Sequence, residues 1–99
     1  MIRHVVMFSW RDGTGEEDVL SVARELNAMA ADIDSLTAFH HGTDIGVNDG
    51  NFDYVVTADF DDRDGYVAYR DHPRHREVVS TVLAPLISSR SAVQFELSQ

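Results

Sequence analysis

The sequence predicts an α+β, ferredoxin-like domain in which helices cover one face of a four-stranded antiparallel sheet. Three observations lead to this class: alternating apolar residues over 2–10, helical apolar spacing over 16–32, and two alternating segments around the turn-forming residues 48–51. The resulting order of strand, helix, strand, strand, helix, strand is that of the split βαβ unit. At 99 residues, the chain is expected to form one domain, residues 1–99.

The first strand is predicted over residues 2–10, with apolar side chains on both of its faces. Thr14 is the expected N-cap of the following helix, with Glu17 three residues later completing a capping box. Apolar residues then recur at helical spacing, which predicts an amphipathic helix over residues 16–32.

The two middle strands are predicted over residues 36–44 and 52–60, and Asn-Asp-Gly-Asn at 48–51 should close them into a hairpin. Asp61 or Asp62 can cap the next helix.

A proline divides the second helical region. The residue before a proline is pushed out of the helical conformation, whereas proline itself fits the first turn, so one helix should end near Asp71 and another should begin at Pro73. The helical pattern continues over residues 78–87, and the last strand is predicted over 91–97.

The sheet is expected to have two unlike faces. The apolar residues of the third and fourth strands should face the helices; these are Phe52, Tyr54, Val56, Ala58, Phe60, Val93, Phe95 and Leu97. The opposite face should be mixed, with Val5, Met7, Phe39, Asp53, Val55, Thr57, Asp59, Gln94 and Glu96. Such a composition is typical of a partly wet subunit interface, so the sequence predicts a homodimer packed sheet against sheet.

Composition limits the chemistry and the partners. The net charge is −9, with eight arginines, no lysine and no cysteine, which excludes Schiff-base chemistry on a lysine, a thiol nucleophile and a disulfide scaffold. An acidic surface disfavours nucleic acid and strongly anionic ligands, so the charge favours a small neutral or weakly polar ligand. No apolar run is long enough for a membrane span, and a cytoplasmic location is the expectation.

The segment from Tyr69 to His75 carries a phenol and two imidazoles around the His72-Pro73 break. His75 should lie in the first turn of a helix, where the positive end of the helix dipole disfavours a charged imidazole. A neutral histidine can act as a general base. The alternative is a helix-breaking hinge with solvated histidines.

Several segments together resemble the stress-responsive A/B barrel (Dabb) domain family. The similarity covers residues 2 to about 97 and rests on the opening Ile2-Arg3-His4-Val5-Val6-Met7-Phe8, on Gly42-Thr43-Asp44, on Ala58-Asp59-Phe60, and on Tyr69-Arg70-Asp71-His72-Pro73-Arg74-His75 followed by Val78-Val79. The resemblance implies a dimeric α/β barrel of two ferredoxin-like protomers. Some plant members respond to stress, and others cyclise linear polyketides by aldol condensation without a cofactor.

The resemblance also implies roles for particular residues. Tyr69 and His75 match the catalytic pair of the cyclising members, with His75 as base and the Tyr69 hydroxyl as donor to an oxyanion. His4 matches a histidine that lines the pocket, and its alternative role is that of a core histidine. The remaining candidate pocket residues are Phe8, Trp10, Tyr66 and His72, for which packing or, at His72, helix capping is the alternative.

Two classes of function follow. The first is a cofactor-independent enzyme that acts on a carbonyl compound by proton abstraction or aldol closure; the second is a non-catalytic ligand-binding or stress-associated dimer. A third class, heme or other oxidative chemistry, is supported only by isolated histidines. The acidic segment 59–65 resembles a calcium loop, but Phe60 occupies the first ligand position, so no metal site is predicted.

Overall fold

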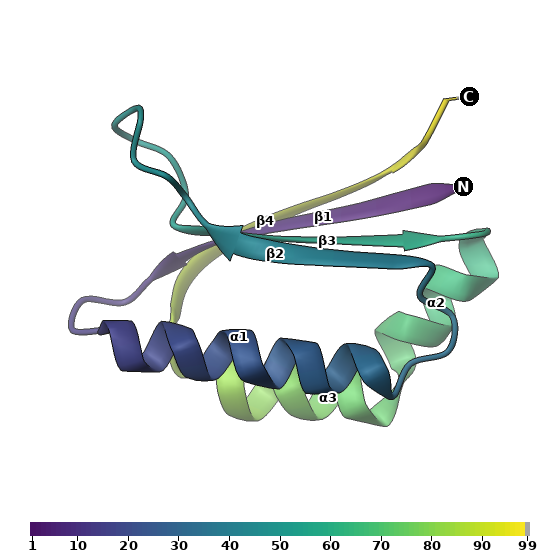
Figure 1. Ribbon diagram of the computed structural model, residues 1–99, viewed down its shortest axis with the longest axis horizontal. Coiled ribbons are helices and arrows are strands. Elements are labelled where there is room, and N and C mark those ends of the chain that lie inside the picture. The colour runs from purple at the N-terminus through teal and green to yellow at the C-terminus, as the bar shows by residue number, and fades with distance from the viewer. Residues whose placement is uncertain (99) are drawn as a thin grey trace.

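Four antiparallel strands form a sheet: β1 (Ile2–Trp10), β2 (Ala38–Thr43), β3 (Tyr54–Phe60) and β4 (Ile87–Glu96). They lie in the order β2-β3-β1-β4, and the helices cover one face of the sheet (Figure 1). The computed structural model describes residues 1–98. Its elements in chain order are β1 (Ile2–Trp10), α1 (Glu16–Ala31), β2 (Ala38–Thr43), β3 (Tyr54–Phe60), α2 (Arg63–Asp71), α3 (Pro73–Val78), the π-helical turn η1 (Val79–Leu83) and β4 (Ile87–Glu96). This order and sheet confirm the predicted ferredoxin-like class.

The hydrophobic core lies between the sheet and the helices. The spacing of apolar residues in α1 turns Val22, Leu26 and Met29 toward the sheet, where all three are buried. They meet the inward side chains of β1 and β3, and α2, α3 and η1 close the layer with Tyr69, Val78 and Leu83. Burial of this apolar surface is the main force that holds the helices on the sheet.

A polar chain ties α1 to the hairpin. The Nε2–H of His41 donates to the Asn27 side-chain oxygen at 2.7 Å, and the Tyr54 hydroxyl donates to His41 Nδ1 at 2.6 Å. Because the amide oxygen can only accept, these contacts are consistent with a neutral His41. Burial lowers the pKa of His41 and raises that of Tyr54, which keeps both groups uncharged.

The start of α1 differs in detail from the prediction. Gly15, not Thr14, is the N-cap, and its N–H donates to the Asp18 carboxylate at 3.0 Å. Asp18 therefore makes the contact that was expected of Glu17. The negative charges of the first turn also lie at the positive end of the helix dipole.

The predicted end of the last helical region was wrong. The helical run ends at Leu83 and β4 already begins at Ile87, so residues 78–87 are not one helix and β4 is longer than 91–97. The run ends in a π-helical turn, in which the Ala84 N–H donates to the Val79 carbonyl at 2.9 Å. Pro85 follows this turn and cannot continue the helical hydrogen bonding.

The predicted faces of β4 were also wrong. Val93 pairs with Val5 and Phe95 pairs with Arg3, so both apolar side chains lie on the face away from the helices. Gln94 pairs with His4 on the helix side, and Glu96 pairs with Ile2. Directly paired residues share a face, and the register, not the apolar character of the strand, decides which face that is.

Phe39 was likewise predicted on the wrong face. It pairs with Ala58, whose side chain is buried under the helices, and it packs against the core.

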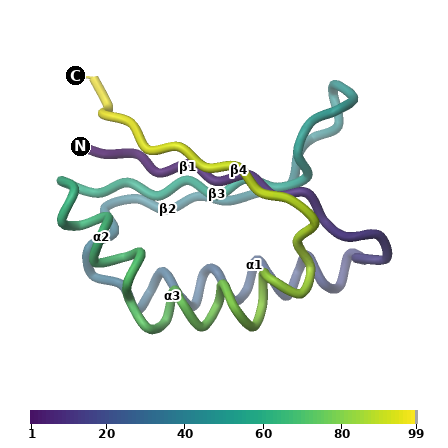
Figure 2. The backbone as a smooth tube through the Cα atoms, turned by 180° about the vertical axis from the view of Figure 1, so that it is seen from behind, coloured from purple at the N-terminus to yellow at the C-terminus, as the bar shows by residue number. Residues whose placement is uncertain are grey.

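The face without helices has a defined set of residues, which we call the open face. Its apolar members are Val5, Met7, Val55, Val93 and Phe95, and its polar or small members are Arg3, Ser9, Ala38, His40, Gly42, Thr57, Asp59, Ser89 and Ser91. The Arg3 guanidinium donates two hydrogen bonds, of 2.8 and 2.9 Å, to the Asp59 carboxylate, which lowers the pKa of Asp59. The loop of residues 44–53 rises on this side of the sheet (Figure 2).

Candidate active site

A cavity of about 520 Å³ lies between the sheet and the helices. Its polar lining contains the two histidines, two tyrosines and two arginines named His4, His75, Tyr66, Tyr69, Arg70 and Arg90. Its other walls are apolar and come from β1, β3, β4, α1, α3, η1 and the residue after η1, namely Val6, Phe8, Leu26, Met29, Val56, Val78, Val79, Leu83, Ala84 and Ile87. Small-molecule sites typically combine such apolar walls with a few polar groups.

The helix break brings Tyr69 and His75 together. The two residues are six positions apart, a separation that would place them on different faces of one continuous helix. In the structure α2 ends at Asp71, His72 is extended, and α3 starts at Pro73. The ring centroids of Tyr69 and His75 are consequently 4.4 Å apart.

One hydrogen bond sets the proton position on His75. Its Nδ1 lies 3.0 Å from the backbone carbonyl oxygen of Arg70, an atom that can only accept, so Nδ1 carries the proton. Burial lowers the pKa of His75, and the carbonyl contact opposes that shift. In the neutral imidazole, Nε2 therefore holds the lone pair, as a general base requires.

His4 has the opposite arrangement. The Gln94 amide donates to His4 Nδ1 at 2.8 Å, so the proton of the neutral ring is on Nε2. Burial is the main reason why the pKa of His4 is lowered to about 4, and His75, when it is protonated, and Arg90 add to this effect. His4 is thus a neutral hydrogen-bond donor at pH 7. Its ring centroid lies 6.1 Å from that of Tyr69.

Tyr69 is a second donor. Its side chain is 3% exposed, and burial raises its pKa, with a further contribution from Tyr66. The phenol therefore keeps its proton at neutral pH. The described site combines one proton acceptor, His75, with two proton donors, Tyr69 and His4.

Other predicted pocket residues divide into two groups. Phe8 and Tyr66 line the cavity, and the tilted rings of Tyr66 and His4 have centroids 5.1 Å apart. Among the described residues, Trp10 and His72 are not in this lining. Trp10 packs against Phe8 and Tyr54. His72 is the N-cap of α3.

The capping contact of His72 is specific: its Nδ1 accepts a hydrogen bond of 3.0 Å from the Arg74 N–H. This is the alternative role that the sequence left open for it.

Gln94, Arg70 and Arg90 are polar groups of the site that sequence reasoning missed. Gln94 and Arg90 were missed because the predicted face of β4 was reversed and its start was placed too late. The spacing of four residues between Arg90 and Gln94 is a signal that they lie on the same face of the strand, because residues i and i+4 of a strand share a face.

The acidic segment after β3 has a structural role. The Asp62 carboxylate accepts a hydrogen bond of 2.9 Å from the Gly65 N–H and caps α2. Within residues 1–98, no group of three or more histidine, aspartate or glutamate side chains is arranged to hold a metal ion. Over the same residues, no helix has both the length and the apolar character needed to cross a membrane.

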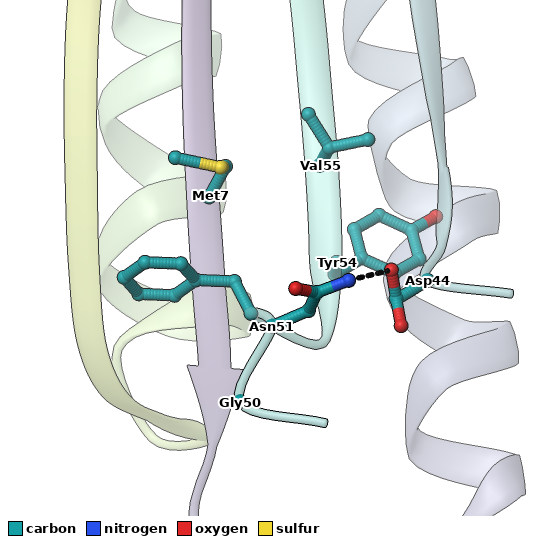
Figure 3. A pocket seen from close by; sticks show the side chains of 7 residues that line it. Met7, Asp44, Gly50, Asn51, Tyr54 and Val55 are labelled. Atoms are coloured by element: carbon teal, nitrogen blue, oxygen red, sulfur yellow. Dashed lines mark hydrogen bonds between the residues drawn. The ribbon is translucent and has the colours of Figure 1, made fainter. Parts of the chain in front are cut away.

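A second hollow, of about 290 Å³, lies on the open face at the base of the 44–53 loop (Figure 3). Met7 and Val55 form its apolar side, and Asn51 donates to the Asp44 carboxylate at 3.2 Å on its polar side. None of the described residues that line it is a histidine. The proton acceptor and donors described above thus belong to the cavity beneath the sheet and not to this hollow.

Comparisons with known proteins agree with this architecture. A model of the Stress Responsive A/B Barrel Domain family matches residues 2–97. A dimeric ferredoxin-like protein of unknown function from Thermobifida fusca is 41% identical, with a TM-score of 0.90, over 97% of this chain and 90% of that chain. A stress-response A/B barrel domain-containing protein of Arabidopsis thaliana is 23% identical over 86% of this chain and 80% of the relative.

A hydroxynitrile lyase from Passiflora edulis shares the fold, with a TM-score of 0.87 over 99% of this chain and 94% of that chain, at 12% identity. At that identity the likeness is one of fold.

Proposed function

The chain belongs to the stress-responsive A/B barrel domain family, and on this basis we propose that it binds a small carbonyl compound in the cavity and removes a proton from the carbon beside the carbonyl, without a cofactor. The observation that carries this proposal is the pair of fixed tautomers. The Arg70 carbonyl leaves a lone pair on His75 Nε2, and the Gln94 amide leaves a proton on His4 Nε2. One acceptor and two donors thus line a single cavity.

In the proposed mechanism, His75 Nε2 accepts the proton from a carbon between two carbonyl groups. The electron pair moves onto a carbonyl oxygen, and the Tyr69 hydroxyl and His4 Nε2–H donate hydrogen bonds to the resulting oxyanion. When the same molecule carries a second carbonyl within reach, the enolate carbon attacks it, and the protonated His75 returns the proton to the new alkoxide. Together these steps form an intramolecular aldol addition, which needs no oxidant or reductant.

The fold of the hydroxynitrile lyase from Passiflora edulis supports only the general idea that this architecture can carry acid–base chemistry. The second candidate function is a ligand-binding, stress-associated protein without turnover. The apolar residues that make up most of the lining favour it, since they can retain a ligand without any chemistry. The name of the relative from Arabidopsis thaliana points in the same direction.

We also propose that the open face is the contact between two copies of this chain. Val93 and Phe95 are 54% and 44% exposed, and they extend the apolar surface of Val5, Met7 and Val55. The open face is more apolar than the sequence predicted, because Val93 and Phe95 lie on it in place of Gln94 and Glu96. The similar protein from Thermobifida fusca is dimeric, and a second copy would remove the apolar side chains from water.

The test of the catalytic proposal uses the diethyl ester of acetylglutaric acid, whose one acidic C–H lies between two carbonyl groups. Exchange of that hydrogen for deuterium is followed by NMR, with the rate in buffer subtracted. We expect the wild-type protein to accelerate exchange, Tyr69→Phe to slow the protein-dependent rate by about 10²- to 10³-fold, and His75→Gln to abolish it.

Two matched variants separate chemistry from folding. Tyr54→Phe removes a tyrosine hydroxyl that bonds His41 instead of lining the cavity, and His40→Gln removes an exposed histidine of β2. Both should leave the exchange rate unchanged. If the wild-type protein binds the ester but exchange stays at the rate in buffer, the catalytic proposal is wrong and ligand binding without turnover is the function.

A further inference from the structure

The charge of the cavity lining is opposite to that of the whole chain. The chain has 17 acidic residues and a net charge of −9. Among residues 1–98, no aspartate or glutamate lines the cavity, whereas two of the eight arginines, Arg70 and Arg90, line it. The sequence predicted a neutral ligand from the net charge, but a ligand in the cavity meets these local charges first.

The two arginines are not equivalent. The Arg70 guanidinium donates two hydrogen bonds to the carboxylate of Asp71: Nε lies 2.9 Å from Oδ1, and Nη2 lies 3.1 Å from Oδ2. The charge of Arg70 is thereby balanced within the protein. Arg90 forms no ion pair with any residue among 1–98. Arg90 is thus the arginine of the lining whose charge is not balanced by a carboxylate of residues 1–98.

The position of Arg90 suits a ligand that also reaches the histidines. It pairs with Phe8 across the β1–β4 ladder, on the face that carries His4 and Gln94. At about 3.3 Å per residue, Arg90 is roughly 13 Å along β4 from Gln94. Arg90 is exposed, so it lies at the mouth of the cavity between the sheet and the helices. Its positive charge nevertheless contributes to the lowered pKa of both His4 and His75. Its guanidinium is therefore within electrostatic range of the proposed reacting centre.

We propose that Arg90 binds a carboxylate of the ligand, so that the substrate class of this site is a carbonyl compound with a carboxylate a few atoms from its reacting carbon. The planar guanidinium fork matches a carboxylate in two parallel hydrogen bonds. The ligand is then held by its charged end at the cavity opening, while its carbonyl end lies against Tyr69, His4 and His75. This inference rests on the proposed function in taking the ligand to be a carbonyl compound.

The experiment compares two ligands that share one reacting centre. The half-ester of acetylglutaric acid carries a free carboxylate at its distal end, and in the diethyl ester that group is neutral. Binding of each is measured by NMR titration, without any need for turnover. We expect the wild-type protein to bind the half-ester about tenfold more tightly or better, the factor that one charge-assisted pair of hydrogen bonds provides.

Variants assign this preference to one side chain. Arg90→Gln should abolish the preference for the half-ester and leave the affinity for the diester unchanged, whereas Arg90→Lys should retain part of it. Arg24→Gln is the matched control, because it removes the same charge from an exposed position of α1 outside the cavity lining. It should keep the full preference. A preference that survives Arg90→Gln, or equal binding of the two esters by the wild-type protein, overturns the inference.

The outcomes distinguish this inference from the proposed function. A preference for the half-ester that is lost in Arg90→Gln, without any acceleration of exchange, supports the carboxylate site and contradicts the catalytic proposal. Accelerated exchange of both esters with equal affinities supports the catalytic proposal and contradicts the role of Arg90. Tyr69→Phe should slow exchange while it retains the preference for the half-ester.

Discussion

Acidification should destabilise this protein chiefly through His4. In the folded chain burial lowers the pKa of His4 to about 4, from an ordinary value of 6.5. Between these two values the unfolded chain binds a proton that the folded chain does not bind, so the free energy of unfolding falls as the pH falls from 6.5 to 4. At 1.36 kcal/mol per pH unit the difference is roughly 3 kcal/mol, and solvent in the cavity reduces it to about 2 kcal/mol.

Two other histidines add to this loss, whereas paired carboxylates such as Asp59 act at lower pH. Burial lowers the pKa of His75 and of His41, so each contributes with the same sign as His4. The pKa of Asp59 is lowered by Arg3. Its contribution is complete above the ordinary value of 3.8 and is lost only as the pH falls further, so it does not enter the window of the histidines.

The assay is urea unfolding at pH 7, 5.5 and 4.5, at one protein concentration because association also changes apparent stability. His4→Gln removes the titrating ring, and its stability should decline less steeply with falling pH than that of the wild-type protein. His40→Gln, at an exposed position of β2, should stay closer to the wild-type slope than His4→Gln, because His40 acts only as a secondary cause of the lowered pKa of His41. The reasoning is refuted if wild type and His4→Gln lose stability in parallel over this range.

Three further predictions concern packing, capping and assembly. Met29→Ala should lower the free energy of unfolding by about 2–5 kcal/mol, measured by urea unfolding, because Met29 is 1% exposed and the deletion enlarges the cavity. Asp62→Ala should cost about 1 kcal/mol through loss of its bond to the Gly65 N–H; an unchanged unfolding midpoint would show that the cap contributes nothing. Phe95→Asp should shift the protein from dimer to monomer in analytical ultracentrifugation, while a wild-type monomer at micromolar concentration would contradict the proposed interface.

The order of the elements and the convergence of Tyr69 and His75 could be predicted because both follow from local chemistry. Apolar spacing distinguishes helix from strand, and the His72-Pro73 dipeptide ends one helix and starts another irrespective of the rest of the fold. His4 is placed by alternation in β1, which has a buried face of clear period two. These are short-range rules, and the structure follows them.

The face of β4 could not be predicted from the same rules. Its apolar residues, Val93 and Phe95, were assigned to the core because apolar side chains are usually buried, but the register with β1 places them on the open face. That register depends on where the preceding helix ends, which is set by the π-helical turn and by Pro85. A long-range pairing therefore decides the positions of Gln94 and Arg90, and with them the tautomer of His4 and the charge of the cavity.

The π-helical turn has a consequence for chain length. A hydrogen bond from residue i+5, as between Ala84 and Val79, encloses one residue more than an α-helical bond does. The helix can thus absorb a one-residue insertion while Pro73 at its start and β4 after it keep their places. We expect a relative whose alignment lacks one residue between 78 and 84 to have a regular α-helix there, with a different side chain in place of Val79 or Leu83 on the cavity wall. Insertion and deletion at this turn would alter cavity shape across homologues without moving the catalytic candidates.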